Sequence, residues 1–209
     1  MRTLPLLLVM LATPAIAAPS MPWLANLDDA VIASSDEPAS TLPLELDPVA
    51  GCEPPAYGGI TLTADLGPPN GRETVVGSYA GGIIVVGSEG QRIATLSGYP
   101  CAGTADELEA MAVGRAWNER VLALVVTSGG RREASTWLGL YRLGATGLEL
   151  LFSGAVEHYE DGVVRTGLVT IVPGGLIHRD PNGDITWWGF EHGSRALQPH
   201  RLSPMLPGA

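Results

Sequence analysis

Residues 82–90 read GIIVVGSEG: a glycine, four apolar residues and a four-residue turn that ends on glycine. The same spacing recurs at residues 139–147, GLYRLGATG, and at residues 175–183, GLIHRDPNG, where the four residues after the opening glycine are mostly but not all apolar. In each copy the glycine that ends the turn lies eight residues after the opening glycine. Such a turn suits a β-hairpin because glycine readily adopts a positive φ. The sequence therefore predicts three antiparallel hairpins of one design.

Short runs rich in β-branched and aromatic residues continue on both sides of these hairpins. They predict strands at residues 60–64, 74–77, 83–86, 92–96, 121–127, 137–143, 148–152, 163–172, 176–178 and 185–190. Over residues 104–113 a Thr-x-x-Glu capping box precedes an apolar run, which leaves a short helix and a strand equally open. We therefore predict an all-β fold of antiparallel hairpin repeats that is propeller-like, with a β-sandwich as the alternative.

The N-terminus has the features of a cleavable export signal. Arg2 precedes an apolar run over residues 4–11, and Ala15-Ile16-Ala17 forms a small-residue cleavage site. The apolar run is too short to span a bilayer. We expect residues 1–18 to be removed and the protein to be secreted or periplasmic.

Composition divides the rest of the chain into three parts. Residues 19–50 are rich in Pro, Ser, Ala and Asp and predict a linker or arm. Its apolar residues Trp23, Leu24 and Leu27 could dock on the domain or on a partner. Residues 51–202 form the predicted β domain, and residues 203–209 a C-terminal tail with two prolines.

The chain is acidic and contains no lysine. All 12 basic residues are arginine against 22 acidic ones, and loss of Arg2 with the signal changes the net charge from −10 to −11. An acidic chain repels phosphate backbones and anionic lipid, so we expect no nucleic-acid binding and no membrane insertion. Mechanisms that need a lysine, such as the P-loop and Schiff-base chemistry, are excluded.

Two cysteines, Cys52 and Cys101, remain in the exported chain. An even number of cysteines outside the reducing compartment predicts one disulfide between them. Closing a loop of that length would stabilise the fold by roughly 4 kcal/mol.

Residues 65–78 read DLGPPNGRETVVGS and run into the first hairpin. Residues 60–96 resemble an FG-GAP or VCBS-type repeat, a family that forms blades of β-propellers and often holds calcium in an Asp/Asn/Gly loop. The resemblance implies a propeller-like fold. Gly67 and Pro69 stand where further acidic ligands are expected, so calcium is not expected as an obligatory cofactor. Three hairpin units are too few for a closed propeller, so a fourth would come from the arm or from a second chain.

Two groups of residues are candidates for binding. Residues 157–161 read EHYED, in which Glu157, His158 and Asp161 could ligate a metal or act as acid and base. Neighbours on a strand face opposite sides, so a solvated acidic loop is the favoured interpretation. Of the adjacent Trp187 and Trp188, one must face outward, where its ring could stack on a sugar or a partner's apolar patch.

Sequence signatures of catalysis are lacking: the chain has no G-x-S-x-G, H-E-x-x-H or C-x-x-C. No catalytic residue is therefore assigned. We expect an exported, soluble binding or structural module that contacts a protein or carbohydrate surface. The alternative is a secreted hydrolase, metal-assisted or not, that uses the patch at residues 157–161.

The export signal predicts the mass of the mature protein. Intact-mass analysis of the exported chain should give an N-terminus near Ala18 or Pro19, because cleavage follows the small-residue site. Recovery of the protein in membranes with Met1 retained would contradict the prediction.

Overall fold

The structure is a computed structural model that describes residues 21–34, 59–67, 72–78, 82–97, 107–191 and 196–201. Within these ranges the only helix is a single 3-10 turn, η1 (Leu24–Asn26), and the other elements are strands. No helix of the described residues has the length and apolar character needed to cross a membrane. The predicted signal peptide, Cys52, Cys101 and the tail at residues 203–209 lie outside the described residues, so export and the disulfide remain predictions.

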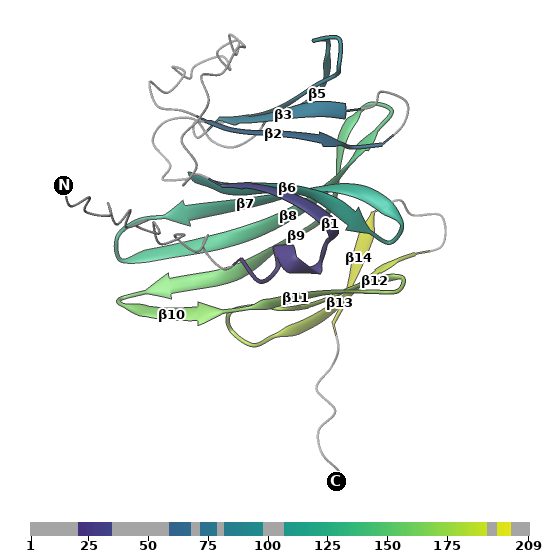
Figure 1. Ribbon diagram of the computed structural model, residues 1–209. Coiled ribbons are helices and arrows are strands. Elements are labelled where there is room, and N and C mark those ends of the chain that lie inside the picture. The colour runs from purple at the N-terminus through teal and green to yellow at the C-terminus, as the bar shows by residue number, and fades with distance from the viewer. Residues whose placement is uncertain are drawn as a thin grey trace, which may run out of the picture.

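The strands of the described chain form three antiparallel sheets (Figure 1). The first sheet contains β2 (Gly59–Asp65), β3 (Arg72–Ser78), β4 (Gly82–Val86) and β5 (Arg92–Ser97). The second has the order β1 (Asp28–Ser34), β6 (Glu107–Ala116), β7 (Glu119–Gly129), β8 (Glu133–Gly144), β9 (Gly147–Glu160) and β10 (Val163–Thr166). The third contains β11 (Leu168–Val172), β12 (Gly175–Arg179), β13 (Ile185–Phe190) and β14 (Leu197–Arg201).

The six-stranded sheet lies between the two four-stranded sheets (Figure 1). Its strand β7 is buried without interruption from Val121 to Val126. Leu122, Leu124 and Val126 pack toward the β2–β5 sheet, and the residues between them pack toward the β11–β14 sheet. Because alternate residues of a strand point to opposite faces, a continuous apolar run needs cover on both sides. The covering sheets enclose two separate cores.

The three predicted hairpins are present as β4–β5, β8–β9 and β12–β13. The glycine that ends each turn has a positive φ: 83° at Gly90, 133° at Gly147 and 97° at Gly183. The β4–β5 and β12–β13 turns are closed by the same pair of backbone hydrogen bonds, with lengths of 2.8 to 3.0 Å. The β8–β9 turn is tighter because Gly144 pairs directly with Gly147.

At two segments the structure goes beyond the sequence expectations. It resolves a choice between helix and strand at the first and corrects the predicted strand at the second. Residues 107–116 form strand β6 and no helix, because residues 110–113 are all buried and alternate between the two cores. The strand expected at residues 163–172 is two strands, β10 and β11, which belong to different sheets. The chain crosses between them at Gly167, where a Cβ would lie 2.6 Å from the carbonyl oxygen of Arg179.

Part of the segment expected to be a linker or arm is folded. Trp23, Leu24 and Leu27 are buried in the core between the six-stranded and β11–β14 sheets. The side-chain amide of Asn26 donates to the carbonyl oxygen of Val169 at 2.7 Å, and β1 pairs with β6. The folded region therefore begins before residue 51, the boundary that composition indicated.

Alanine substitution of Gly183 tests whether the β12–β13 turn needs a residue that readily adopts a positive φ. A Cβ at Gly183 would meet nothing within 4 Å, but its φ is 97°. Gly183→Ala should therefore lower the free energy of unfolding by about 1–2 kcal/mol, measured by urea denaturation. Gly130→Ala is the matched control, because Gly130 also has open space but no positive φ, and it should leave stability nearly unchanged. Equal effects at the two positions would contradict the argument.

Candidate functional site

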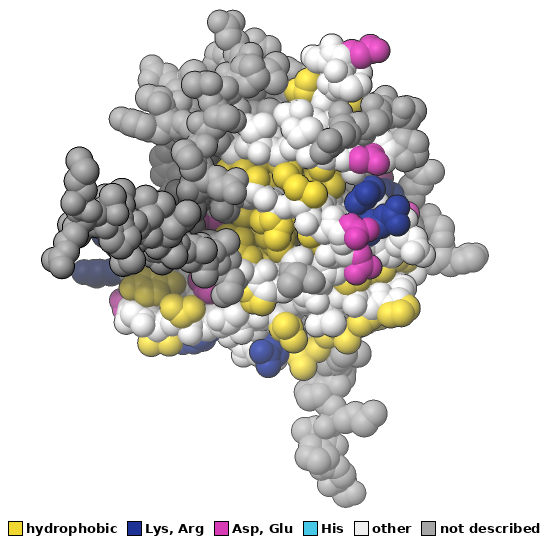
Figure 2. Space-filling view, viewed as in Figure 1, with side chains coloured by type: hydrophobic (Ala, Val, Ile, Leu, Met, Phe, Trp, Pro, Cys, Tyr) yellow, Lys and Arg dark blue, Asp and Glu magenta, His cyan; other side chains and the backbone are white. Residues whose placement is uncertain are grey.

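A cleft of about 1070 Å³ opens at one end of the three sheets. We call it the end cleft; residues 65–67, 115, 117–120, 142–144, 149, 173–174 and 190 line it. These residues come from the β2–β3, β6–β7, β8–β9 and β11–β12 turns, which lie together on the right of Figure 1, and from the end of β13. Acidic and basic side chains gather at the same end of the molecule in Figure 2. The cleft therefore depends on the stacking of all three sheets.

The wall formed by β8 and β9 exists because that hairpin leaves the plane of its sheet. In Figure 1 the hairpin rises toward the β2–β5 sheet. A register shift between Leu140 and Tyr141 marks a β-bulge at the bend, and bulges bend the strand that carries them. Beyond the bend, Tyr141, Leu143 and Leu148 pack against the core on the β2–β5 side.

The β6–β7 turn at the cleft is strained. Trp117 and Asn118 both have left-handed backbone conformations, with φ of 53° and 64°, which form a two-residue turn of type I′. Asparagine tolerates this conformation, but a bulky tryptophan rarely adopts it. The indole N–H of Trp117 donates to the carbonyl oxygens of Val172 at 3.1 Å and Gly175 at 2.6 Å. Its ring also meets the Phe190 ring edge-on, with centroids 5.3 Å apart. These contacts fix the turn against the β11–β14 sheet and offset the strain.

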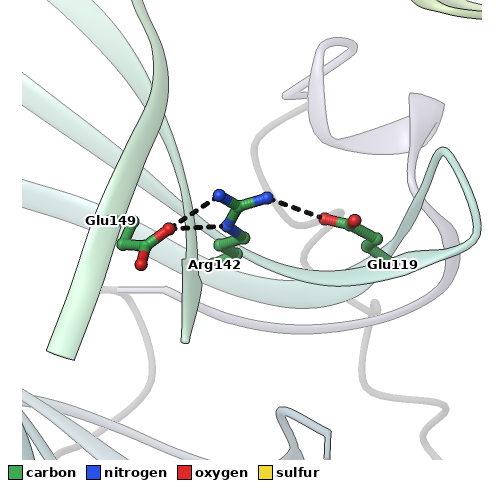
Figure 3. A network of polar contacts seen from close by, with 3 residues as sticks. All are labelled: Glu119, Arg142 and Glu149. Carbon is green, nitrogen blue, oxygen red and sulfur yellow. Dashed lines mark hydrogen bonds and ion pairs between the residues drawn. The ribbon is translucent and has the colours of Figure 1, made fainter. Parts of the chain in front are cut away.

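Arg142 is held between two carboxylates (Figure 3). Its Nε and Nη2 donate to Oε2 of Glu149 at 2.8 and 2.7 Å, and its Nη1 lies 3.6 Å from Oε2 of Glu119. The three residues belong to neighbouring strands β7, β8 and β9. The Arg142 side chain is only 16% exposed, so the network is shielded from water and ties these strand ends together.

Arg115 and Arg120 differ from Arg142. They lie directly opposite each other across β6 and β7 and therefore on the same face of the sheet. Arg115 is exposed and Arg120 half-buried. Within the part of the chain that the structure describes, neither makes an ion pair, although Asp28 is the cross-strand neighbour of Arg115. Like charges at directly opposite positions of a strand pair repel each other.

Asp65 and Glu73 belong to the segment that resembles a calcium-binding loop. Their carboxylates lie on opposite faces of the β2–β3 hairpin. Asp65 is exposed, and its Oδ1 accepts the N–H of Gly67 at 2.8 Å. Glu73 is fully buried; its Oε2 accepts the N–H of Leu66 at 2.8 Å, and its Oε1 has no hydrogen-bond partner among the described residues. Asn70 lies outside the described residues. The expectation about calcium stays a prediction.

The patch at residues 157–161 lies at the opposite end of the sheet from the end cleft (Figure 1). Glu157 and His158 are neighbours on β9 and point to opposite faces, while Asp161 is in the β9–β10 turn. Nδ1 of His158 is 3.0 Å from Oγ of Ser135. Across the described ranges, no three His, Cys, Asp or Glu side chains come close enough to hold a metal ion. The structure thus does not bring Glu157, His158 and Asp161 to one point.

Trp187 and Trp188 lie on opposite faces of the β11–β14 sheet. The Trp188 ring packs on the core and meets the Phe152 ring edge-on at 5.1 Å. The Trp187 ring is half-buried on the outer face, 5.0 Å from the His200 ring at an interplanar angle of 34°. A Cβ at Gly189 would collide with the Trp187 ring, so glycine is required beneath it.

Comparisons of the chain with protein-family models, curated proteins and solved structures found no match. The site is therefore argued from geometry alone.

Sequence reasoning did not single out the residues of the end cleft as a site. They come from four turns that are far apart along the chain, so no local motif joins them. Two local signals lie at the cleft: the loop that begins at Asp65, which the calcium resemblance drew attention to, and Trp117-Asn118 between two apolar runs, because asparagine favours tight turns.

Removing the Arg142 side chain should show that the network is structural. Arg142→Met should lower the free energy of unfolding by about 1–3 kcal/mol, since it leaves Glu149 and Glu119 facing each other without a cation. Arg165→Met is the matched control: Arg165 pairs with Glu160 at 3.3 Å, but both side chains are about half exposed. The control should change stability by no more than about 0.5 kcal/mol. Chemical denaturation measures both, and equal losses would contradict the shielding argument.

Proposed function

We propose that this protein is an exported binding module that takes its ligand in the end cleft. The observation that carries the proposal is the lining of the cleft, which combines aromatic and apolar side chains with two arginines that have no ion-pair partners among the described residues. Ligand sites typically combine an apolar lining with a few placed polar groups. Because the turns that form the cleft extend from packed sheets, its shape is set before a ligand arrives.

The arrangement of the sheets supports a propeller-like architecture for this module. Strands β2–β5, β6–β9 and β11–β14 are three consecutive four-stranded antiparallel units that pack face to face. Blades of β-propellers are units of this kind, and their loops commonly form the binding surface at one end. Three units leave such a ring open, and the outer face of the last unit carries exposed Leu168, Ile177 and Ile185.

The export signal and the predicted Cys52–Cys101 disulfide support a periplasmic or secreted location. A hydrolase at residues 157–161 is less well supported. The contact between Ser135 and His158 has the residue types of a nucleophile and its base, yet none of the described carboxylates is hydrogen-bonded to the other ring nitrogen of His158.

Amide chemical shifts can locate the binding surface. Small carboxylates, sugars and amines are added to the isotopically labelled mature protein, and we expect shifts at Gly67, Asn118 and Gly174, which line the end cleft. Trp187→Ala is the control: it removes the aromatic ring of the outer face and should leave these shifts unchanged. Shifts confined to Trp187 and its neighbours would indicate that the ligand binds to the outer face of the β11–β14 sheet and not in the end cleft. Failure of all the compounds to perturb the cleft would overturn the proposal.

A further inference from the structure

We propose that the end cleft recognises a singly charged carboxylate attached to an apolar body, and that Arg115 and Arg120 hold the carboxylate. The inference rests on the proposed binding role of the cleft and adds the chemical class of its ligand.

The first argument is the contrast among the three arginines that line the cleft. Arg142 has its charge balanced by Glu149 and Glu119 and is mostly buried. Arg115 and Arg120 face each other, reach toward solvent and have no ion pair with any described residue. Their donor groups have no hydrogen-bond partner among the described residues, and guanidinium groups match the geometry of a carboxylate with two parallel hydrogen bonds.

The facing arginines and the conformation of the turn between them are both locally unfavourable. Like charges at directly opposite positions repel, and the turn that joins the two strands holds Trp117 at a φ of 53°. The bonds from Trp117 to Val172 and Gly175 fix this turn, so the backbone positions of the two arginines are set by packing outside their own hairpin. A bound oxyanion would remove the repulsion.

The third argument selects a monoanion with an apolar body. Asp65, Glu119 and Glu149 line the same cleft, and the whole chain has a net charge of −10. A doubly charged phosphate meets more repulsion from these carboxylates than a carboxylate does. On the face of the sheet that carries the arginines, Leu66 and Leu143 line the cleft and offer an apolar surface of the kind that an aromatic or aliphatic group covers.

Matched small molecules test the class of ligand. Phenylacetate, its neutral isostere phenylacetamide, phenethylamine and phenyl phosphate are titrated separately into the mature protein by calorimetry and by amide chemical shifts. We expect phenylacetate to bind in the cleft about tenfold more tightly than phenylacetamide, and more tightly than phenyl phosphate. Its affinity should fall as ionic strength rises. Equal affinity for phenylacetate and phenylacetamide would overturn the inference, and tighter binding of phenyl phosphate would reassign the site to phosphate.

Substitutions test the two arginines. Arg115→Gln and Arg120→Gln should each weaken phenylacetate binding about tenfold, whereas Arg179→Gln, which changes an exposed arginine on β12, should not. The double variant should melt no lower than the parent chain, because a repulsive pair is removed. Unchanged binding in the single variants would show that the arginines are not ligand-binding groups. A double variant that melts lower than the parent chain would contradict the repulsion between them.

The two proposals fail in different ways. If phenethylamine or phenylacetamide perturbs the cleft while phenylacetate does not, the cleft is a binding site and only the carboxylate inference falls. If none of the four compounds perturbs it, the binding role itself falls as well.

Discussion

Burial of strand β7 on both faces is the constraint on which the rest of the structure depends. From Val121 to Val126 every side chain is removed from water, so the six-stranded sheet needs a second sheet on each side. The β2–β5 sheet covers one face and the β11–β14 sheet the other. Because both covering sheets pack on the same central strands, the turns at one end of all three sheets meet. The end cleft follows directly from this stacking.

The three arginines that line the cleft differ in whether their charge is balanced by a carboxylate. Arg142 is neutralised by Glu149 and Glu119, and this network stabilises the curled end of the central sheet. Arg115 and Arg120 lie in the same cleft without such partners among the described residues. If all three arginines served only stability, compensation would be expected at each of them. This difference between Arg142 and the other two arginines is the reason that we propose the cleft as the binding site.

Features set by short stretches of sequence could be predicted. The three hairpins depend on glycines at fixed spacing, and their closing glycines take the positive φ that such turns require. Strand β1 was missed because its segment shows no sustained period, and the apolar residues before it, Trp23, Leu24 and Leu27, become buried only against residues far along the chain. The sequence could not decide between a helix and a strand at residues 104–113. An apolar run that is buried on both faces shows no alternation of apolar and polar residues. The end cleft was beyond local reasoning, since it combines turns from three sheets.

Trp117 connects the local conformation of the β6–β7 turn to the packing of the three sheets. Its indole N–H and ring fasten the β6–β7 turn to the third sheet, so the position of Arg115 and Arg120 is fixed by packing that lies outside their own hairpin. A hairpin alone would not keep a tryptophan at positive φ, because the local conformational energy opposes it. The stacked third sheet provides the contacts that hold Trp117 in this conformation. The strain is therefore evidence that the geometry of the cleft is imposed by the fold as a whole, as a preorganised binding site requires.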